Sequence, residues 1–277
     1  MDFTKMQGIG NDYIYINCFQ ERVDDPAALS RRLSDRHFGV GGDGIILIKP
    51  SDRADCEMDI YNADGSRAMM CGNGIRCVGK YVHDRGICSK NPLRVDTQSG
   101  IKTLWLNVQD GAVQTVRVDM GAPVLRPSEI PAALPGERAV GVPYTVGGEE
   151  YRITCVGMGN PHCVVFVEDV DALDLERIGP QFEHAPVFPQ RVNTEFIQVL
   201  GPGEVRMRVW ERGSGETWAC GTGACASAVA CVLNQKTGRD VLVHLRGGDL
   251  HITWDGSANT VFMEGPAAFV FDGTVDG

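Results

Sequence analysis

Long apolar runs are absent from this sequence. No stretch of the 277 residues approaches 18 consecutive apolar positions, so we expect no membrane-spanning helix and no membrane partner. Residues 1–11 lack the apolar central region of a signal peptide, and Asp2 stands where positive charge is usual. We therefore expect a cytoplasmic protein.

Clusters of basic residues are also missing. The chain has 26 Lys and Arg residues against 36 Asp and Glu residues, a formal net charge of −10, and no Lys/Arg-rich run breaks that balance. This composition argues against nucleic acid or an anionic surface as a partner and leaves a small molecule as the expected ligand.

Motifs for metals and cofactors are lacking as well. No two of the ten cysteines have CxxC spacing, so we do not expect a structural zinc site. Without an export signal, the cysteines are expected to be reduced thiols. No GxGxxG motif follows a strand with an acidic residue about 20 positions later, and no Walker-type lysine occurs. We expect no cofactor and no metal.

What the sequence does contain is an internal repeat. The motifs CGNG and CGTG begin at Cys71 and Cys220, which are 149 residues apart (71 to 220), and the same offset relates residues 8–11 (GIGN) to residues 157–160 (GMGN). Further pairs at this offset are Leu93 and Leu242, Trp105 and Trp254, and Asn62 and Glu211. Such a gap-free match predicts two copies of one domain.

The repeat sets the expected domain boundaries. We predict one lobe over residues 1–120 and a second over residues 121–264. The prolines that follow the first copy, within residues 121–150, suit an irregular connection, although a proline-rich surface loop inside one domain is the alternative.

Each half is predicted to contain short strands and one helix. Runs of β-forming residues are typical of strands at residues 13–16, 45–48, 164–167, 205–209 and 241–245. Apolar residues recur at helical spacing directly after each cysteine motif, with Gly86 and Gly238 as the expected stops. We predict an α+β fold of two pseudo-symmetric lobes, each a curved, mostly antiparallel sheet around a central helix. The active site is expected in the cleft between the lobes.

The position of the two cysteines indicates chemistry. A helix N-terminus favours a thiolate, and glycines after Cys71 and Cys220 leave backbone N–H groups open to bind a carboxylate. Two such thiols supply the acid and the base needed to invert a carbon centre. The alternative is a pair of tight glycine turns with buried cysteines, the packing role that we assign to Cys77 and Cys225.

Several segments resemble a known family. GNDYIYI (10–16), NADGSRAMMCGNGIRC (62–77), GNPH (159–162) and ERGSGETWACGTGACA (211–226) are similar to diaminopimelate epimerases. The resemblance implies a cofactor-independent isomerase that interconverts LL- and meso-diaminopimelate for lysine and cell-wall precursor synthesis. It also implies that a C-terminal strand, residues 265–277, returns to the first lobe, and it allows a homodimer.

The resemblance also implies roles for individual residues. Cys71 and Cys220 are the catalytic pair, and His162 lies near the thiols. The implied substrate contacts are Asn11, Asn62, Gly72, Asn73, Asn160, Asn193, Glu211, Arg212, Gly221 and Thr222. The sequence departs from the family at Gly44, where some members carry a glutamine that contacts substrate.

Other readings stay open at this point. The asparagines next to glycines could be turn residues, His162 a core histidine, and Glu211 with Arg212 a surface pair. The nearest rival function is a racemase of the same fold acting on proline, hydroxyproline or histidine. A rival of another class is a binding module or thiol redox sensor without catalysis.

Overall fold

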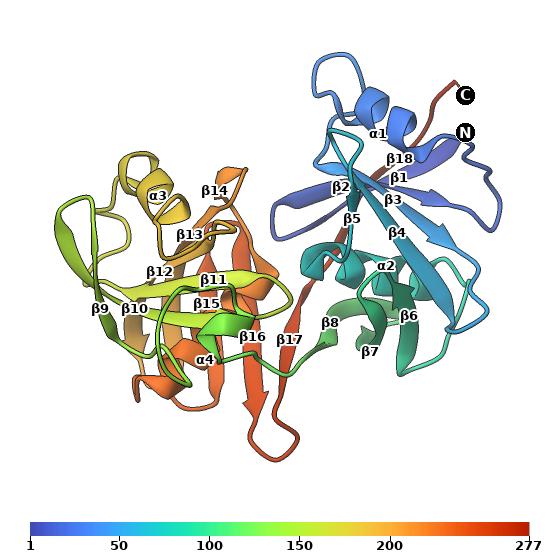
Figure 1. Ribbon diagram of the computed structural model, residues 1–277. Helices are drawn as coiled ribbons and strands as arrows, with labels where there is room; N and C mark the ends of the chain where they lie inside the picture. Colours follow the sequence, from blue (N-terminus) through green and yellow to red (C-terminus); the bar gives the residue numbers. More distant parts are fainter. Residues whose placement is uncertain (277) are drawn as a thin grey trace. The chain divides into compact units, whose positions relative to one another are not determined.

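The structure is a computed structural model that describes residues 1–276. It contains two compact units, drawn with their element labels in Figure 1. Unit 1 comprises residues 1–119 and the C-terminal residues from 264, and unit 2 comprises residues 120–263. Residues 121–150, expected as a connection, are part of unit 2.

Unit 1 is a mixed sheet with two helices. Its strands are β1 (Asp2–Gly8), β2 (Asn11–Asn17), β3 (Gly44–Lys49), β4 (Cys56–Asn62), β5 (Arg67–Ala68), β6 (Leu93–Thr97), β7 (Gly100–Gln109), β8 (Ala112–Gly121) and β18 (Ala268–Thr274). Its helices are α1 (Pro26–Ser34) and α2 (Gly72–Asp84). Strands β2 and β3 pair in parallel, as do β4 and β6, and the other pairs are antiparallel.

Unit 2 repeats this plan. Its strands are β9 (Val142–Val146), β10 (Glu149–Gly157), β11 (Pro161–Phe166), β12 (Asn193–Gly201), β13 (Glu204–Glu211), β14 (Gly215–Thr217), β15 (Asp240–Leu245), β16 (Gly248–Asp255) and β17 (Thr260–Pro266). Its helices are α3 (Leu175–Glu183), α4 (Gly221–Leu233) and the short 3₁₀ helix η1 (Pro127–Glu129). Its parallel pairs are β11 with β12 and β13 with β15, which correspond at the repeat offset to β2 with β3 and β4 with β6 in unit 1.

The helices reproduce the repeat without a gap. Helices α2 and α4 have the same bounds after the offset of 149 residues, and so do α1 and α3. The first turn of α1 is capped by Asp25, whose side chain accepts from the N–H of Ala28; Asp174 does the same for Arg177 in α3. The duplication predicted from two cysteine motifs therefore extends to helices outside those motifs.

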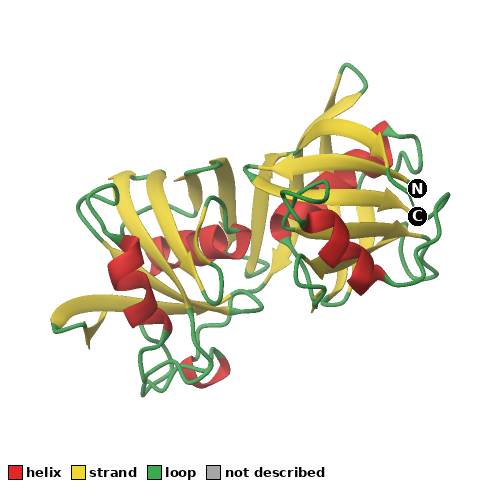
Figure 2. Ribbon diagram, turned by 90° about the horizontal axis from the view of Figure 1, so that it is seen from above, coloured by secondary structure: helices red, strands yellow, loops and turns green. Residues whose placement is uncertain are grey.

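The helices that follow the cysteines are the central ones. In unit 2, α4 packs against β10, β11, β12, β15 and β16, and ten of its first eleven residues are buried. Because a helix that is apolar and small all round can be enclosed by strands, its run of alanine, glycine and cysteine suits that position. Figure 2 shows helices lying among the strands of each unit. The predicted α+β lobes with a central helix are confirmed.

The helices differ from the sequence prediction in two respects. The sequence indicated one helix per half, but α1 and α3 are additional; they bury Leu29 and Leu33 in unit 1 and the matching Ile178 and Phe182 in unit 2. The second central helix does not run to Gly238, because α4 ends at Leu233 and Gln235 takes the left-handed conformation (φ 56°).

Among residues 1–276, no helix is long and apolar enough to cross a membrane.

Candidate active site

Cys71 occupies the N-cap of α2. Its backbone is extended (φ −134°, ψ 117°), and its Sγ accepts the N–H of Gly74 at 3.3 Å. The thiol in turn donates to Oδ1 of Asn11 at 3.2 Å. A sulfur that receives a first-turn N–H lies at the positive end of the helix, which favours negative charge on it.

Asn11 is held by an aspartate that the sequence analysis did not single out. The Nδ2 group of Asn11 donates to Asp43 at 2.7 Å, so its Oδ1 faces Cys71. Arg36 bonds Asp43 from the solvent side. Burial raises the pKa of Asp43, while hydrogen bonds from the Asp12 N–H and Asn11 act against that shift.

Asn62 and Gly44 lie opposite each other on β4 and β3. Asn62 donates from Nδ2 to the Ser66 hydroxyl at 3.0 Å. Gly44 has φ 155°, and a Cβ there would lie 2.1 Å from the Tyr61 carbonyl oxygen. The backbone at this position therefore requires glycine, and a glutamine side chain cannot be accommodated without a shift of β4.

The first turn of α2 is fixed from inside unit 1 by Arg76. This arginine is fully buried and donates to the Gly72 carbonyl, to Asn73 Oδ1 at 3.0 Å and to the Pro266 carbonyl at 3.1 Å. It thus ties the backbone of residues 72–73 to the C-terminal segment. The side chain of Asn73 is thus engaged in a bond inside unit 1.

Cys220 has the same N-cap position on α4 (φ −122°, ψ 106°) but a different environment. Burial raises the pKa of this thiol well above its usual value, and the carboxylates of Glu211 and Glu195 raise it further; Thr222 and the Gly223 N–H act in the opposite direction. We expected the helix terminus to favour a thiolate. At Cys220 burial and two carboxylates outweigh it, so this cysteine is suited to hold a proton.

Glu211, Asn193 and Arg212 lie where β13 ends. Glu211 is the last residue of β13, its carboxylate accepts from the Thr217 hydroxyl, and burial raises its pKa. Asn193 Oδ1 accepts the Arg212 N–H at 3.0 Å. The Arg212 side chain is exposed and donates to the Gln190 carbonyl at 3.1 Å. Because the strand ends at Glu211, consecutive side chains are not forced to opposite faces.

His162 is buried completely and uses both ring nitrogens. Nδ1 lies 2.7 Å from Glu195 Oε1, and Nε2 lies 2.9 Å from Asn160 Oδ1. Glu195 was not singled out from the sequence. The available signal was an acidic residue inside a β-forming segment, VNTEFI at residues 192–197.

The structure thus gives two half-sites, one in each unit. The first contains Asn11, Gly44, Asn62, Cys71, Gly72 and Asn73; the second contains Asn160, His162, Asn193, Glu211, Arg212, Cys220, Gly221 and Thr222. Within the part of the chain that the structure describes, no group of three His, Cys, Asp or Glu side chains could hold a metal ion.

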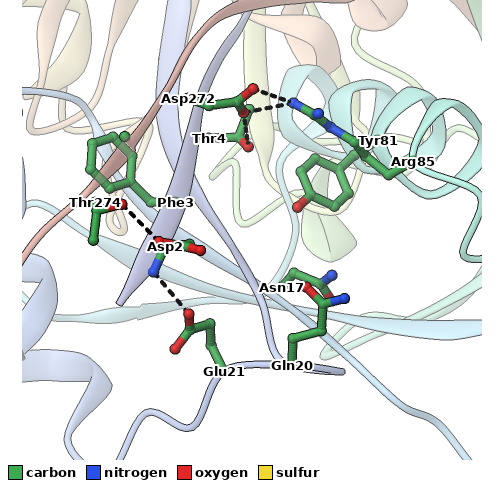
Figure 3. A pocket seen from close by; sticks show the side chains of 11 residues that line it. Asp2, Phe3, Thr4, Asn17, Gln20, Glu21, Tyr81, Arg85, Asp272 and Thr274 are labelled. Carbon is green, nitrogen blue, oxygen red and sulfur yellow. Dashed lines mark hydrogen bonds and ion pairs between the residues drawn. The ribbon is translucent and has the colours of Figure 1, made fainter.

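A separate surface cavity of about 480 Å³ lies elsewhere in unit 1 (Figure 3). Its polar lining groups bond to each other: Thr4 and Arg85 both donate to Asp272, and Glu21 accepts the Asp2 N–H. It contains none of the residues of the half-sites, so we do not assign it to the reaction.

Solved structures with the same architecture define the class of fold. A hydroxyproline epimerase from Agrobacterium vitis matches with a TM-score of 0.69 at 15% identity, covering 99% of this chain and 91% of that chain. A phenazine biosynthesis protein of the PhzF family from Bacillus anthracis matches with a TM-score of 0.71 at 16% identity, covering 99% and 98%. The chain therefore has the two-lobed fold of this group of epimerases and related proteins.

Sequence relatives narrow the class to one family. The family model described as diaminopimelate epimerase matches residues 3–126 and 154–270. Diaminopimelate epimerases from Agathobacter rectalis and Acetivibrio thermocellus are 56% and 55% identical, each covering 100% of this chain and 99% of the relative. The chain belongs to the diaminopimelate epimerase family, as the resemblance of its motifs predicted, and is an isomerase.

Proposed function

We propose that this protein interconverts LL- and meso-diaminopimelate without a cofactor, using Cys71 and Cys220 as its acid–base pair. The observation that carries the proposal is that both cysteines cap central helices with the same bounds in the repeat. Full-length identity above 50% to relatives named diaminopimelate epimerase supports the substrate.

The two thiols serve opposite faces of one α-carbon. A thiolate on one side takes the α-proton, and the thiol on the other side delivers its own proton to the opposite face. The electron pair of the broken C–H bond forms the new C–H bond, so no electrons are gained or lost. Each turnover exchanges the protonation states of the two sulfurs, and the reverse reaction uses them in the opposite order.

Charge that develops next to the α-carboxylate is stabilised by helix N-termini. The backbone N–H groups of Gly72 and Asn73 in unit 1, and of Gly221 and Thr222 in unit 2, belong to the first turns of α2 and α4. First-turn N–H groups lack partners within a helix and bind anions. They favour a transition state in which negative charge spreads onto the carboxylate.

The unreacting end of the substrate explains the polar residues that proton transfer does not need. It carries a carboxylate and an ammonium group. The exposed Arg212 guanidinium is able to grip the carboxylate in a forked geometry, and Glu211, Asn62, Asn160 and Asn193 provide acceptors for ammonium. The repeat matches Asn62 to Glu211, an asymmetry that suits a substrate whose two ends are bound differently.

The setting of the reaction is part of the proposal. We place the enzyme in the cytoplasm, in the synthesis of lysine and the cell-wall precursor, with no nucleic-acid or membrane partner. A homodimer, which the family resemblance allows, is also part of the proposal. Sedimentation of the purified protein tests the oligomeric state.

The function is tested by incubating the protein with LL-diaminopimelate in deuterated water. Formation of the meso isomer together with deuterium at the α-carbon is expected, and Cys71→Ala and Cys220→Ala should each abolish epimerisation. Cys77→Ala is the control, because Cys77 is buried inside α2 and takes no part in the reaction. Comparable turnover of proline, or a Cys220→Ala enzyme with normal rates, would contradict the proposal.

A further inference from the structure

His162 and Glu195 form a buried polar pair on neighbouring strands. In the parallel pairing of β11 with β12, His162 is opposite Asn193, so Glu195, two residues further on, lies on the same face. Both side chains are 0% exposed, and Nδ1 of the imidazole lies 2.7 Å from Glu195 Oε1. A carboxylate only accepts, so Nδ1 carries the hydrogen and the orientation of the ring is fixed.

The same carboxylate lies directly behind the loop of Cys220. A Cβ placed on Gly223 would lie 2.6 Å from Glu195 Oε1 and 3.2 Å from Cys220 Sγ. The carboxylate oxygen and the sulfur therefore border the same small volume, which only a glycine leaves free. An acidic group at this range acts strongly on a buried thiol.

The pair is costly to bury, which argues against a purely structural role. Of the two Glu195 oxygens, Oε2 has no hydrogen-bond partner among the described residues. A buried carboxylate with an unsatisfied oxygen is destabilising compared with an apolar residue of similar size. Such a group in a native core calls for a functional explanation.

Unit 1 shows what the position looks like without the carboxylate. At the repeat offset, Glu195 corresponds to Ile46 and Gly223 to Gly74. A Cβ on Gly74 would meet Ile46 Cδ1 at 2.7 Å and Cys71 Sγ at 3.5 Å, so isoleucine stands behind Cys71 in the place of the carboxylate. The surroundings of the two thiols thus differ at this matched position in the core.

We propose that Glu195 is a positioning residue for this reaction: it holds the imidazole of His162, and its buried charge behind Cys220 keeps the proton on that sulfur, so that Cys71 is the first of the two thiols to give up its proton. This inference rests on the proposed two-cysteine function and extends it, since it assigns unequal starting states to the two thiols.

The other charged groups around Cys220 either raise the pKa of its thiol, as Glu195 does, or are held in place by Glu195. Glu211 on β13 adds negative charge near Cys220. The imidazole of His162 on β11 lowers the pKa of Glu211, whereas burial raises it. Glu195 also holds His162 in place. A substitution of Glu195 therefore changes both the charge near Cys220 and the effect of His162 on Glu211.

Two substitutions separate the charge of Glu195 from its packing. Glu195→Gln keeps the shape and an oxygen that accepts from His162 Nδ1, but removes the charge. Glu195→Ile introduces the residue found at the matched position of unit 1. Asp59→Asn is the control, because Asp59 is a buried carboxylate of unit 1 that pairs with Lys49 and Arg67.

The measurements are kcat and KM for LL-diaminopimelate across pH, and the pH dependence of methylthiolation of each cysteine, followed by peptide mass spectrometry. In the wild type, Cys71 should react at lower pH than Cys220. In Glu195→Gln, the midpoint for Cys220 should fall by about one pH unit while that of Cys71 stays. We expect kcat to fall by about 10- to 100-fold with KM nearly unchanged, because the charge that holds the proton on Cys220 is removed while the hydrogen bond to His162 is kept.

The possible results are distinguishable. An inactive wild type would refute the proposed function itself. An active wild type with unchanged labelling and kcat in Glu195→Gln would overturn the role of Glu195, as would a loss of activity in which neither the Cys220 midpoint nor the pH profile moves. If Glu195→Ile does not fold, Glu195→Gln decides alone. A shift of the Cys220 midpoint in Asp59→Asn would also overturn it, because the effect would not be specific to Glu195.

Discussion

Adding one methyl group at Gly223 should destabilise the protein more than adding the same group at Gly74. The two glycines occupy the third position of α4 and of α2, so they differ in their neighbours and not in their place on the helix. At Gly223 the new Cβ would lie 2.6 Å from Glu195 Oε1, and at Gly74 it would lie 2.7 Å from Ile46 Cδ1.

The magnitudes follow from what must move. The Glu195 carboxylate is held by His162, so Gly223→Ala costs about 1–3 kcal/mol of overpacking and weakens a charged hydrogen bond of about 1.5–3 kcal/mol. Alanine has a higher helix propensity than glycine, which stabilises either variant by up to about 1 kcal/mol. We therefore expect a net loss of about 2–4 kcal/mol for Gly223→Ala. At Gly74 the contact is the end of an apolar side chain, and the net change should stay within about 1 kcal/mol.

Thermal unfolding followed by circular dichroism provides the assay. For a unit of this size the expected drop in Tm is about 5–12 °C for Gly223→Ala and less than about 4 °C for Gly74→Ala. Hydrogen exchange in α2 and α4 shows which unit is affected, because two units need not unfold together. Equal stability of the two variants, with normal exchange in α4, would refute the reasoning.

Two further outcomes follow from the charged residues. Hydrogen bonds from Thr4 and Arg85 hold the pKa of Asp272 below its ordinary value of 3.8, so its contribution to stability is present above that value and is lost as the pH falls through the lowered pKa (Figure 3). Because the side chain is 60% exposed, Asp272→Asn should cost no more than about 1 kcal/mol at pH 7, and the difference in Tm from wild type should close in acid; a gap that persists at low pH would contradict this. Arg212→Lys should lower kcat/KM for LL-diaminopimelate by about 100-fold or more, because an ammonium cannot reproduce a two-point grip on a carboxylate. Steady-state kinetics that match wild type would show that Arg212 does not bind the distal end.

The repeat was readable from the sequence because its strongest signals are local. The cysteine–glycine motifs fix the start of α2 and α4, and apolar spacing fixes their course. The same offset also contained the signal for α1 and α3, since Asp25 and Asp174 stand one residue before their helices and cap both. Those helices have only nine residues and bury two or three large apolar side chains each, which is why periodicity alone did not indicate them.

The missed features depend on tertiary contacts. Gln235 ends α4 with a positive φ that a residue with a side chain rarely adopts, so the sequence pointed instead to Gly238. Glu195 looked like one acidic residue in a strand, and nothing local shows that it meets His162 on the neighbouring strand. Arg76 was not singled out from the sequence, and it is fully buried against the segment that contains Pro266, 190 residues further along the chain.

The exchange of Ile46 for Glu195 between matched positions bears on why both copies belong to one polypeptide. A dimer built from a single short gene product would display the same residue at both positions, and its two halves would inherit every mutation together. Encoding the copies in tandem removes that coupling: codon 46 and codon 195 vary independently. Single substitutions are therefore enough to make the two half-sites of a symmetric ancestor chemically different. Neither a second gene nor the selective assembly of a heterodimer is required.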